Sequence, residues 1–191
     1  LNVPLLREML KNSRCVGVKN SSMPVQDIQM FKAAAGEDYI VFNGPDEQFI
    51  SGRLIGADGG IGGTYGVMPE LFVKLNKLLE AGDFENAGKL QDDIDEVIYT
   101  MCSTKGNMYA TAKAALKIRA GLELGGVREP LLNLAEGDDV IVNKVVDLSA
   151  KYGISNIGFS TLGSLTYSDY TDDEYPSRKN MGADVKEMIK G

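Results

Sequence analysis

Any chemistry in this chain must come from Lys, Tyr, Asp, Glu, Ser and Thr side chains, because the sequence contains no histidine. That absence excludes Ser-His-Asp and Cys-His nucleophile systems and histidine metal ligands. The only two cysteines, Cys15 and Cys102, are too few for a four-thiolate zinc site or a disulfide framework, and we expect both to be buried. A net charge of −7 argues against a general nucleic-acid-binding surface.

Lys19 is the first candidate for chemistry, since it directly follows an apolar run over residues 15–18. If that run is a buried strand, the ammonium at its end is partly desolvated, which lowers its pKa and frees the amine for Schiff-base formation. The alternative is a lysine whose long side chain carries its charge out to water at a strand end. On the residues alone, this second interpretation is favoured.

Two further segments have residue types that suit a binding site. Asp46 and Glu47 follow Asn-Gly-Pro at the predicted start of a helix, where they either stabilise the helix dipole or meet a polyhydroxylated ligand. Residues 59–66 read Gly-Gly-Ile-Gly-Gly-Thr-Tyr-Gly, without the Gly-Lys-Ser/Thr of a phosphate-binding P-loop. This loop indicates either close approach of the backbone to a ligand or tight packing.

The periodicity of residues 1–66 predicts a β-α-β-α-β order with parallel strands. A short helix over residues 5–10 precedes the first strand, which ends at Lys19. Ser21 or Ser22 is expected to cap the next helix, which covers residues 25–35 and closes at Gly36. The remaining elements are a strand at 39–42, a helix through 49–54 and a Gly-rich strand at 59–62.

From residue 68 onward the apolar period is helical. It predicts helices near residues 71–79, 84–98, 108–122 and 138–152, which together form a C-terminal helical bundle. We expect three parts: a partial βα barrel over 1–66, further helices over 67–154, and an unassigned appendage over 155–191. No apolar run reaches the roughly 18–20 residues of a membrane span, and a reduced, cytoplasmic setting is expected.

Five segments in this order resemble the dihydrodipicolinate synthase and N-acetylneuraminate lyase superfamily of pyruvate-dependent class I aldolases. They are Val-Gly-Val-Lys-Asn-Ser-Ser at 16–22, Phe-Asn-Gly-Pro-Asp-Glu-Gln-Phe at 42–49, Gly-Ala-Asp-Gly-Gly-Ile-Gly-Gly-Thr-Tyr-Gly at 56–66, Gly-Asn-Met-Tyr at 106–109 and Val-Arg-Glu-Pro-Leu at 127–131. The resemblance covers residues 1–153 and implies the C-terminal part of a (β/α)8 barrel, about three βα units, with extra C-terminal helices.

The resemblance also implies a function. Lys19 would form a Schiff base with the keto group of its substrate, so that neither a metal nor another cofactor is required. Asp46-Glu47, in place of the Asp-Asp common in dihydrodipicolinate synthases, favours the sialic acid branch, which cleaves N-acetylneuraminate to N-acetylmannosamine and pyruvate. Ser21 is expected to contact substrate. The other implied substrate-binding residues are Gly44, Asp46, Glu47, Gly62 and Gly63.

Gly63 departs from the pattern of some lyases, which have serine there, so that only backbone contacts are expected at this position. The family implies small-molecule substrates and a homo-oligomer, a tetramer, with no nucleic acid and no membrane as partners. Two alternatives stay open. The chain could belong to another branch of the superfamily, a dihydrodipicolinate synthase or a sugar-acid aldolase. It could also be a catalytically incomplete fragment or chimera that acts as an assembly or interaction module, because three strands cannot close a barrel of eight.

Overall fold

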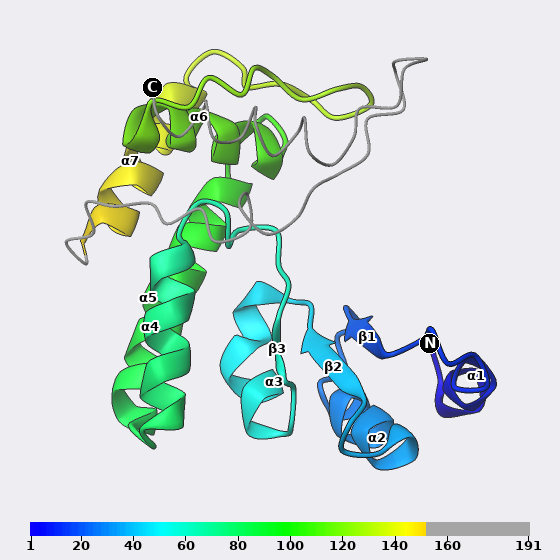
Figure 1. The fold of residues 1–191 in the computed structure, drawn as a ribbon. Helices are drawn as coiled ribbons and strands as arrows, with labels where there is room; N and C mark the ends of the chain where they lie inside the picture. Colours follow the sequence, from blue (N-terminus) through cyan, green and yellow to red (C-terminus); the bar gives the residue numbers. More distant parts are fainter. Residues whose placement is uncertain (152–191) are drawn as a thin grey trace, which may run out of the picture. The chain divides into compact units, whose positions relative to one another are not determined.

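The computed structural model describes residues 1–151 (Figure 1). Its elements follow the predicted order of alternating strands and helices and then helices alone. They are α1 (Val3–Met9), β1 (Gly17–Asn20), α2 (Gln26–Ala35), β2 (Ile40–Asn43), the 3₁₀ turn η1 (Asp46–Gln48), α3 (Phe49–Leu54), β3 (Gly59–Gly60), α4 (Pro69–Glu80), α5 (Phe84–Cys102), α6 (Met108–Ala120) and α7 (Asp138–Ala150). The predicted appendage over residues 155–191 lies outside the described residues.

The three strands form a parallel sheet in the order β1-β2-β3, which confirms the predicted direction. Lys19 lies in register with Phe42, and Phe42 with Gly59. One residue further on, Asn20 pairs with Asn43, and Asn43 with Gly60. All three strands therefore end at the same edge of the sheet.

The helices α1 and α2 cover one face of this sheet. A cluster of buried apolar residues fills the space between them: Leu6, Ile28, Phe31, Tyr39, Val41 and Ala57. Side chains alternate along a strand, so Ile40 and Phe42, on either side of Val41, point to the opposite face of the sheet. Ile40 is 38% exposed there. That opposite face carries no layer of helices among the described elements.

A second, larger core joins α3 to α7. Its buried residues come from all five helices and from Val67 and Met68, which lead into α4. The ring of Tyr65 stacks on Phe72 at a centroid distance of 3.8 Å, and Phe49 meets both rings edge-on. The ion pair between Arg119 and Glu70, both largely buried, ties α6 to the start of α4. The C-terminal helices are thereby packed on the last βα unit.

Three local expectations are wrong. The first strand is not buried: β1 pairs only with β2 in the described part of the chain, so Val16 is 64% exposed and Lys19 is exposed. Neither serine caps α2, whose N-cap is Val25. The Ser22 hydroxyl lies instead 2.6 Å from Asn20 Oδ1 and 2.8 Å from Asp27 Oδ2.

The cysteines are the third correction. Cys102 is exposed because it is the last residue of α5, and Cys15 is partly exposed because it precedes the edge strand. Within residues 1–151, no helix is long and apolar enough to cross a membrane. The same residues contain no group of three or more Cys, Asp or Glu side chains that could hold a metal ion.

Candidate functional site

The loops that leave the three strands meet at one edge of the sheet, because hydrogen bonds continue the strand ladder into them. Gly44 N–H donates to the Asn20 carbonyl at 2.8 Å, and Ile61 N–H donates to the Asn43 carbonyl at 2.9 Å. In parallel α/β folds, functional groups gather at the carboxyl ends of strands. The structure brings the three predicted site segments together at such an edge: the end of the first strand at Lys19, the loop carrying Asp46 and Glu47, and the Gly-rich loop over residues 59–66.

Lys19 lies at the end of β1 and points to the open face of the sheet, opposite to the buried Asn20. Its exposure agrees with the interpretation favoured on the residues alone, a lysine that carries its charge to water, since β1 has a partner strand on one side only in the described chain. Lys19 lies in register with Phe42, so it lies at the edge of the sheet from which the loop carrying Asp46 leaves β2. Burial raises the pKa of Asp46, and the positive charge of Lys19 partly opposes that rise.

Ser21 and Gly44 lie against each other where the first two loops leave the sheet. Ser21 is exposed and Gly44 is buried. A Cβ atom at Gly44 would overlap the Ser21 hydroxyl and lie 2.6 Å from the Asn20 carbonyl oxygen. Glycine is therefore required at residue 44 for the loops to approach as they do.

Asp46 connects the second and third loops. Its Oδ2 atom accepts hydrogen bonds from both the backbone N–H and the hydroxyl of Thr64, the former at 2.8 Å. Its carboxyl group also occupies the space that any side chain at Gly62 would need. Asp46 is 6% exposed, and this burial raises the pKa of its carboxyl group, an effect that the bonds from Thr64 partly oppose.

The two adjacent acids differ in their surroundings. Glu47 is exposed, while Asp46 is buried and held by Thr64. The negative charge of Glu47 adds to the rise in the pKa of Asp46. The sequence predicted a pair of carboxylates, and the structure resolves it into one fixed acid and one that faces solvent.

Tyr65 and Tyr109 also reach this edge, although the sequence assigned them no role. The Tyr65 hydroxyl lies over Gly60, and burial raises its pKa, with the negative charge of Asp46 adding to the rise. The Tyr109 hydroxyl lies 2.9 Å from the position of a Cβ atom on Gly63, which is itself exposed. Tyr109 belongs to the first turn of α6, so the C-terminal helices contribute a polar group to the strand-end loops.

Sequence reasoning missed two other residues, Thr64 and Gln91. Thr64 was visible only as part of the Gly-rich loop, and Gln91 lies on α5, 45 residues from the loop that it contacts. Amphipathic periodicity marks the buried face of α5, but it does not show which loop a buried polar side chain meets.

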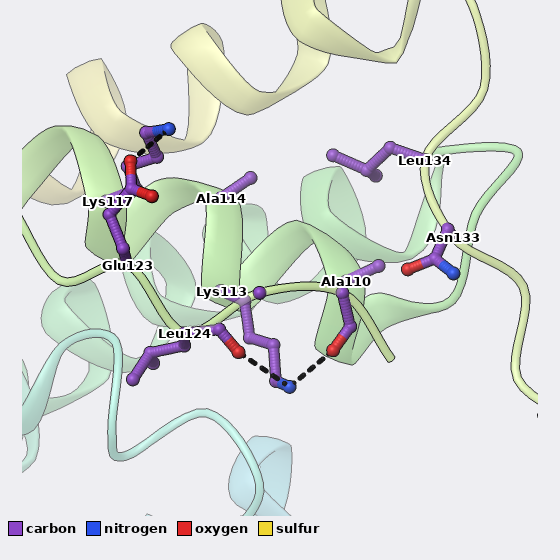
Figure 2. Close-up of a pocket in the computed structure, with 10 residues that line it drawn as sticks. Ala110, Lys113, Ala114, Lys117, Glu123, Leu124, Asn133 and Leu134 are labelled. Atoms are coloured by element: carbon purple, nitrogen blue, oxygen red, sulfur yellow. Dashed lines mark hydrogen bonds and ion pairs between the residues drawn. The ribbon is translucent and has the colours of Figure 1, made fainter. Parts of the chain in front are cut away.

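A separate pocket lies between α6 and the segment 121–134 (Figure 2). Lys113 donates there to the carbonyls of Leu124 at 3.3 Å and Gly126 at 2.6 Å, and Lys117 pairs with Glu123. None of the sequence-predicted site residues lines this pocket. Its lysines are used to hold the 121–134 segment on α6.

The curated proteins that this chain matches include two N-acetylneuraminate lyases, each aligned over 144 residues. The chain is 61% identical to that of Mediterraneibacter gnavus, covering 75% of this chain and 46% of the relative, and 34% identical to that of Rhizobium meliloti, covering 75% and 47%. The chain therefore spans about half the length of the curated relatives it matches.

Solved structures of sialic acid aldolases also match this chain over about half of their own length. The wild-type sialic acid aldolase of Ruminococcus gnavus aligns with a TM-score of 0.77 at 59% identity, covering 78% of this chain and 50% of that one. Its catalytic lysine mutant aligns with a TM-score of 0.76. The described α/β unit, with its three parallel strands, is thus part of the TIM-barrel fold of these proteins. The model of the dihydrodipicolinate synthetase family matches residues 1–148, and the chain belongs to this family.

Proposed function

We propose that this chain provides the C-terminal half of a sialic acid aldolase that cleaves N-acetylneuraminate to N-acetylmannosamine and pyruvate. The observation that carries the proposal is the position of Lys19, an exposed amine near the end of β1, at the sheet edge from which the loop carrying Asp46 leaves β2. It is supported by the 61% identity to a relative named N-acetylneuraminate lyase and by the catalytic lysine named for the R. gnavus aldolase.

In the proposed reaction, the Lys19 amine attacks the keto carbon of open-chain sialic acid and water leaves, which forms an imine. The C3–C4 bond then breaks, its electron pair moves toward the iminium nitrogen, and the C4 hydroxyl loses its proton as N-acetylmannosamine departs as an aldehyde. The remaining enamine takes up a proton at C3, and water hydrolyses the imine to pyruvate and free Lys19. The iminium is itself the electron sink, which is the reason for an amine nucleophile and for a reaction without a further cofactor.

The other residues at this edge suit a polyhydroxylated ligand. Carboxylates accept hydrogen bonds from hydroxyl groups, and backbone amides bind oxygen atoms where no side chain intervenes. We assign substrate binding to Asp46 and Glu47, to the Ser21 hydroxyl, and to the backbone of Gly44, Gly62 and Gly63. Small-molecule substrates and a homo-oligomeric assembly, a tetramer in the family, complete the proposal.

The test combines the 191-residue chain with the part of the M. gnavus relative that it does not match. Borohydride is added in the presence of pyruvate, and we expect the mass of one reduced pyruvyl group on Lys19. Lys19→Arg should abolish the adduct, whereas Lys144→Arg, which changes an exposed lysine on α7, should leave it unchanged. An adduct that is absent, or that forms on another lysine, overturns the proposal.

One alternative is another reaction of the same family, favoured by the family model that the chain matches. The reconstituted protein should cleave N-acetylneuraminate faster than it condenses pyruvate with aspartate semialdehyde. The opposite ranking would assign the chain to the dihydrodipicolinate synthase branch.

A further inference from the structure

Gln91 is a buried polar side chain on α5 that binds the loop carrying Asp46 through both ends of its amide. It is 8% exposed, and its Nε2 atom donates to the Asp46 carbonyl at 3.2 Å. Its Oε1 atom accepts from Ile50 N–H, also at 3.2 Å. Both ends of one amide therefore bind the same five-residue segment, residues 46–50. Gln91 and Asp46 are 45 residues apart in the sequence.

The two backbone groups that Gln91 binds are four residues apart. In an uninterrupted α-helix, Ile50 N–H would bond directly to the Asp46 carbonyl. Here the Gln91 amide bridges these two groups, and the Asp46 carbonyl accepts from Phe49 N–H in the tighter 3₁₀ pattern. The segment accordingly begins as η1 and continues as α3, with Asp46 as the first residue of the tight turn.

The orientation of the Gln91 amide is fixed by its third bond. Nε2 also donates to Asp95 Oδ1 at 2.9 Å, one turn further along α5. A carboxylate and a carbonyl both accept hydrogen bonds, while Ile50 N–H donates one, so only one orientation of the amide satisfies all three groups. Gln91 is therefore pre-set to hold the turn before any ligand arrives.

Asp46 is held from two sides. Thr64 binds its carboxyl group and Gln91 binds its carbonyl, and together they leave the acid little freedom to move. We propose that Gln91 is a positioning residue, which sets the η1 turn and so places Asp46 and its neighbour Glu47 against the hydroxyl groups of the substrate. The inference rests on the proposed function for what Asp46 binds, but the hold on the turn is a property of this chain.

The first test needs no activity. In the 191-residue chain, Gln91→Met keeps the length of the side chain and removes its hydrogen bonds. Loss of a buried hydrogen bond should accelerate amide hydrogen exchange at Ile50 about tenfold. The control is Thr100→Val, another nearly buried polar residue of α5, which should leave exchange at Ile50 unchanged. Equal exchange at Ile50 in wild type and Gln91→Met overturns the proposal.

The second test uses the reconstituted enzyme. Gln91→Met should raise KM for N-acetylneuraminate about tenfold, a loss of the size of one buried hydrogen bond, and change the rate of pyruvate trapping on Lys19 less than about twofold. A merely structural role would only reduce the fraction of folded protein, which lowers the maximal rate and the trapping rate alike and leaves KM unchanged, and that outcome contradicts the proposal. If the wild type forms no adduct, the proposed function fails, while exchange at Ile50 still decides whether Gln91 holds the turn.

Discussion

The hydroxyl of Tyr109 lies where a side chain at Gly63 would begin. Some lyases of the family have serine at this position, and here Tyr109 places a hydroxyl beside the same loop from a different element. Because Tyr109 is 46% exposed, its hydroxyl is open to a ligand at the strand ends. At this point of the strand-end loops, α6 therefore places a polar group beside a residue that has no side chain of its own.

We predict that Tyr109→Phe weakens binding of the sugar part of the substrate. Loss of one hydrogen bond from a neutral hydroxyl should raise KM for N-acetylneuraminate by roughly three- to tenfold in the reconstituted enzyme. Pyruvate trapping on Lys19 should stay unchanged, because pyruvate lacks the sugar hydroxyls. Tyr99→Phe, which changes an exposed tyrosine of α5, is the matched control. Steady-state kinetics decide the point, and an unchanged KM in Tyr109→Phe contradicts it.

At the scale of elements, Asp138 joins the start of α7 to the turn that begins α6. Its buried carboxylate accepts hydrogen bonds from the backbone N–H groups of Lys105, Gly106 and Ala135, at 2.9, 3.1 and 2.8 Å. These bonds lower the pKa of Asp138 below its ordinary value of 3.8, and the bond from Ala135 has the largest effect. Asp138 thereby fixes the turn from which Tyr109 projects.

A carboxyl group with a lowered pKa in the folded state stabilises the fold above its unfolded pKa, and this contribution is lost as pH falls through the folded pKa. We therefore expect Asp138→Asn to lower Tm by a few degrees at pH 7. The difference in Tm should begin to shrink below the ordinary value of 3.8 and disappear only below the lowered pKa of the folded protein. Asp139→Asn changes an exposed acid of the same turn and should follow the wild type. Thermal unfolding followed by circular dichroism from pH 7 to pH 2 tests this, and similar curves for the two variants speak against it.

The elements were predictable from the sequence because each depends on local periodicity. The parallel β-α-β-α-β order and the four later helices follow from the spacing of apolar residues, and Gly36 ends α2 as expected. The exposure of β1 was not predictable, since it depends on which strands lie beside it. The contacts of Thr64 and Gln91 with Asp46 depend on packing between segments 18 and 45 residues apart, which periodicity does not encode. The roles of the predicted site residues and the three-part division of the chain stay predictions.

For the whole molecule, the sheet face that carries Lys19 has no covering layer of helices in the described chain. Ile40, on that face, is 38% exposed, and β1 presents a free edge among the described strands. Open strand edges and exposed apolar faces favour pairing with another chain. The chain spans about half the length of its relatives, and we predict that the partner of this face is the half of the barrel that the chain does not match.

We predict that the isolated chain sediments as self-associated species, and that adding the unmatched half of the M. gnavus relative converts them to a defined complex. A lysine at the centre of this face should oppose both processes, because its charge would have to be buried on association. Ile40→Lys should therefore weaken complex formation about tenfold or more, the minimum expected for burying one unpaired charge. Val73→Lys, on the exposed side of α4, adds the same charge at a residue that is 54% exposed and should leave association unchanged.

Analytical ultracentrifugation of both variants, alone and with the added half, separates the outcomes. A monomeric wild-type chain that ignores the added half would show that this face needs no partner, and would favour a module that works without the rest of the barrel.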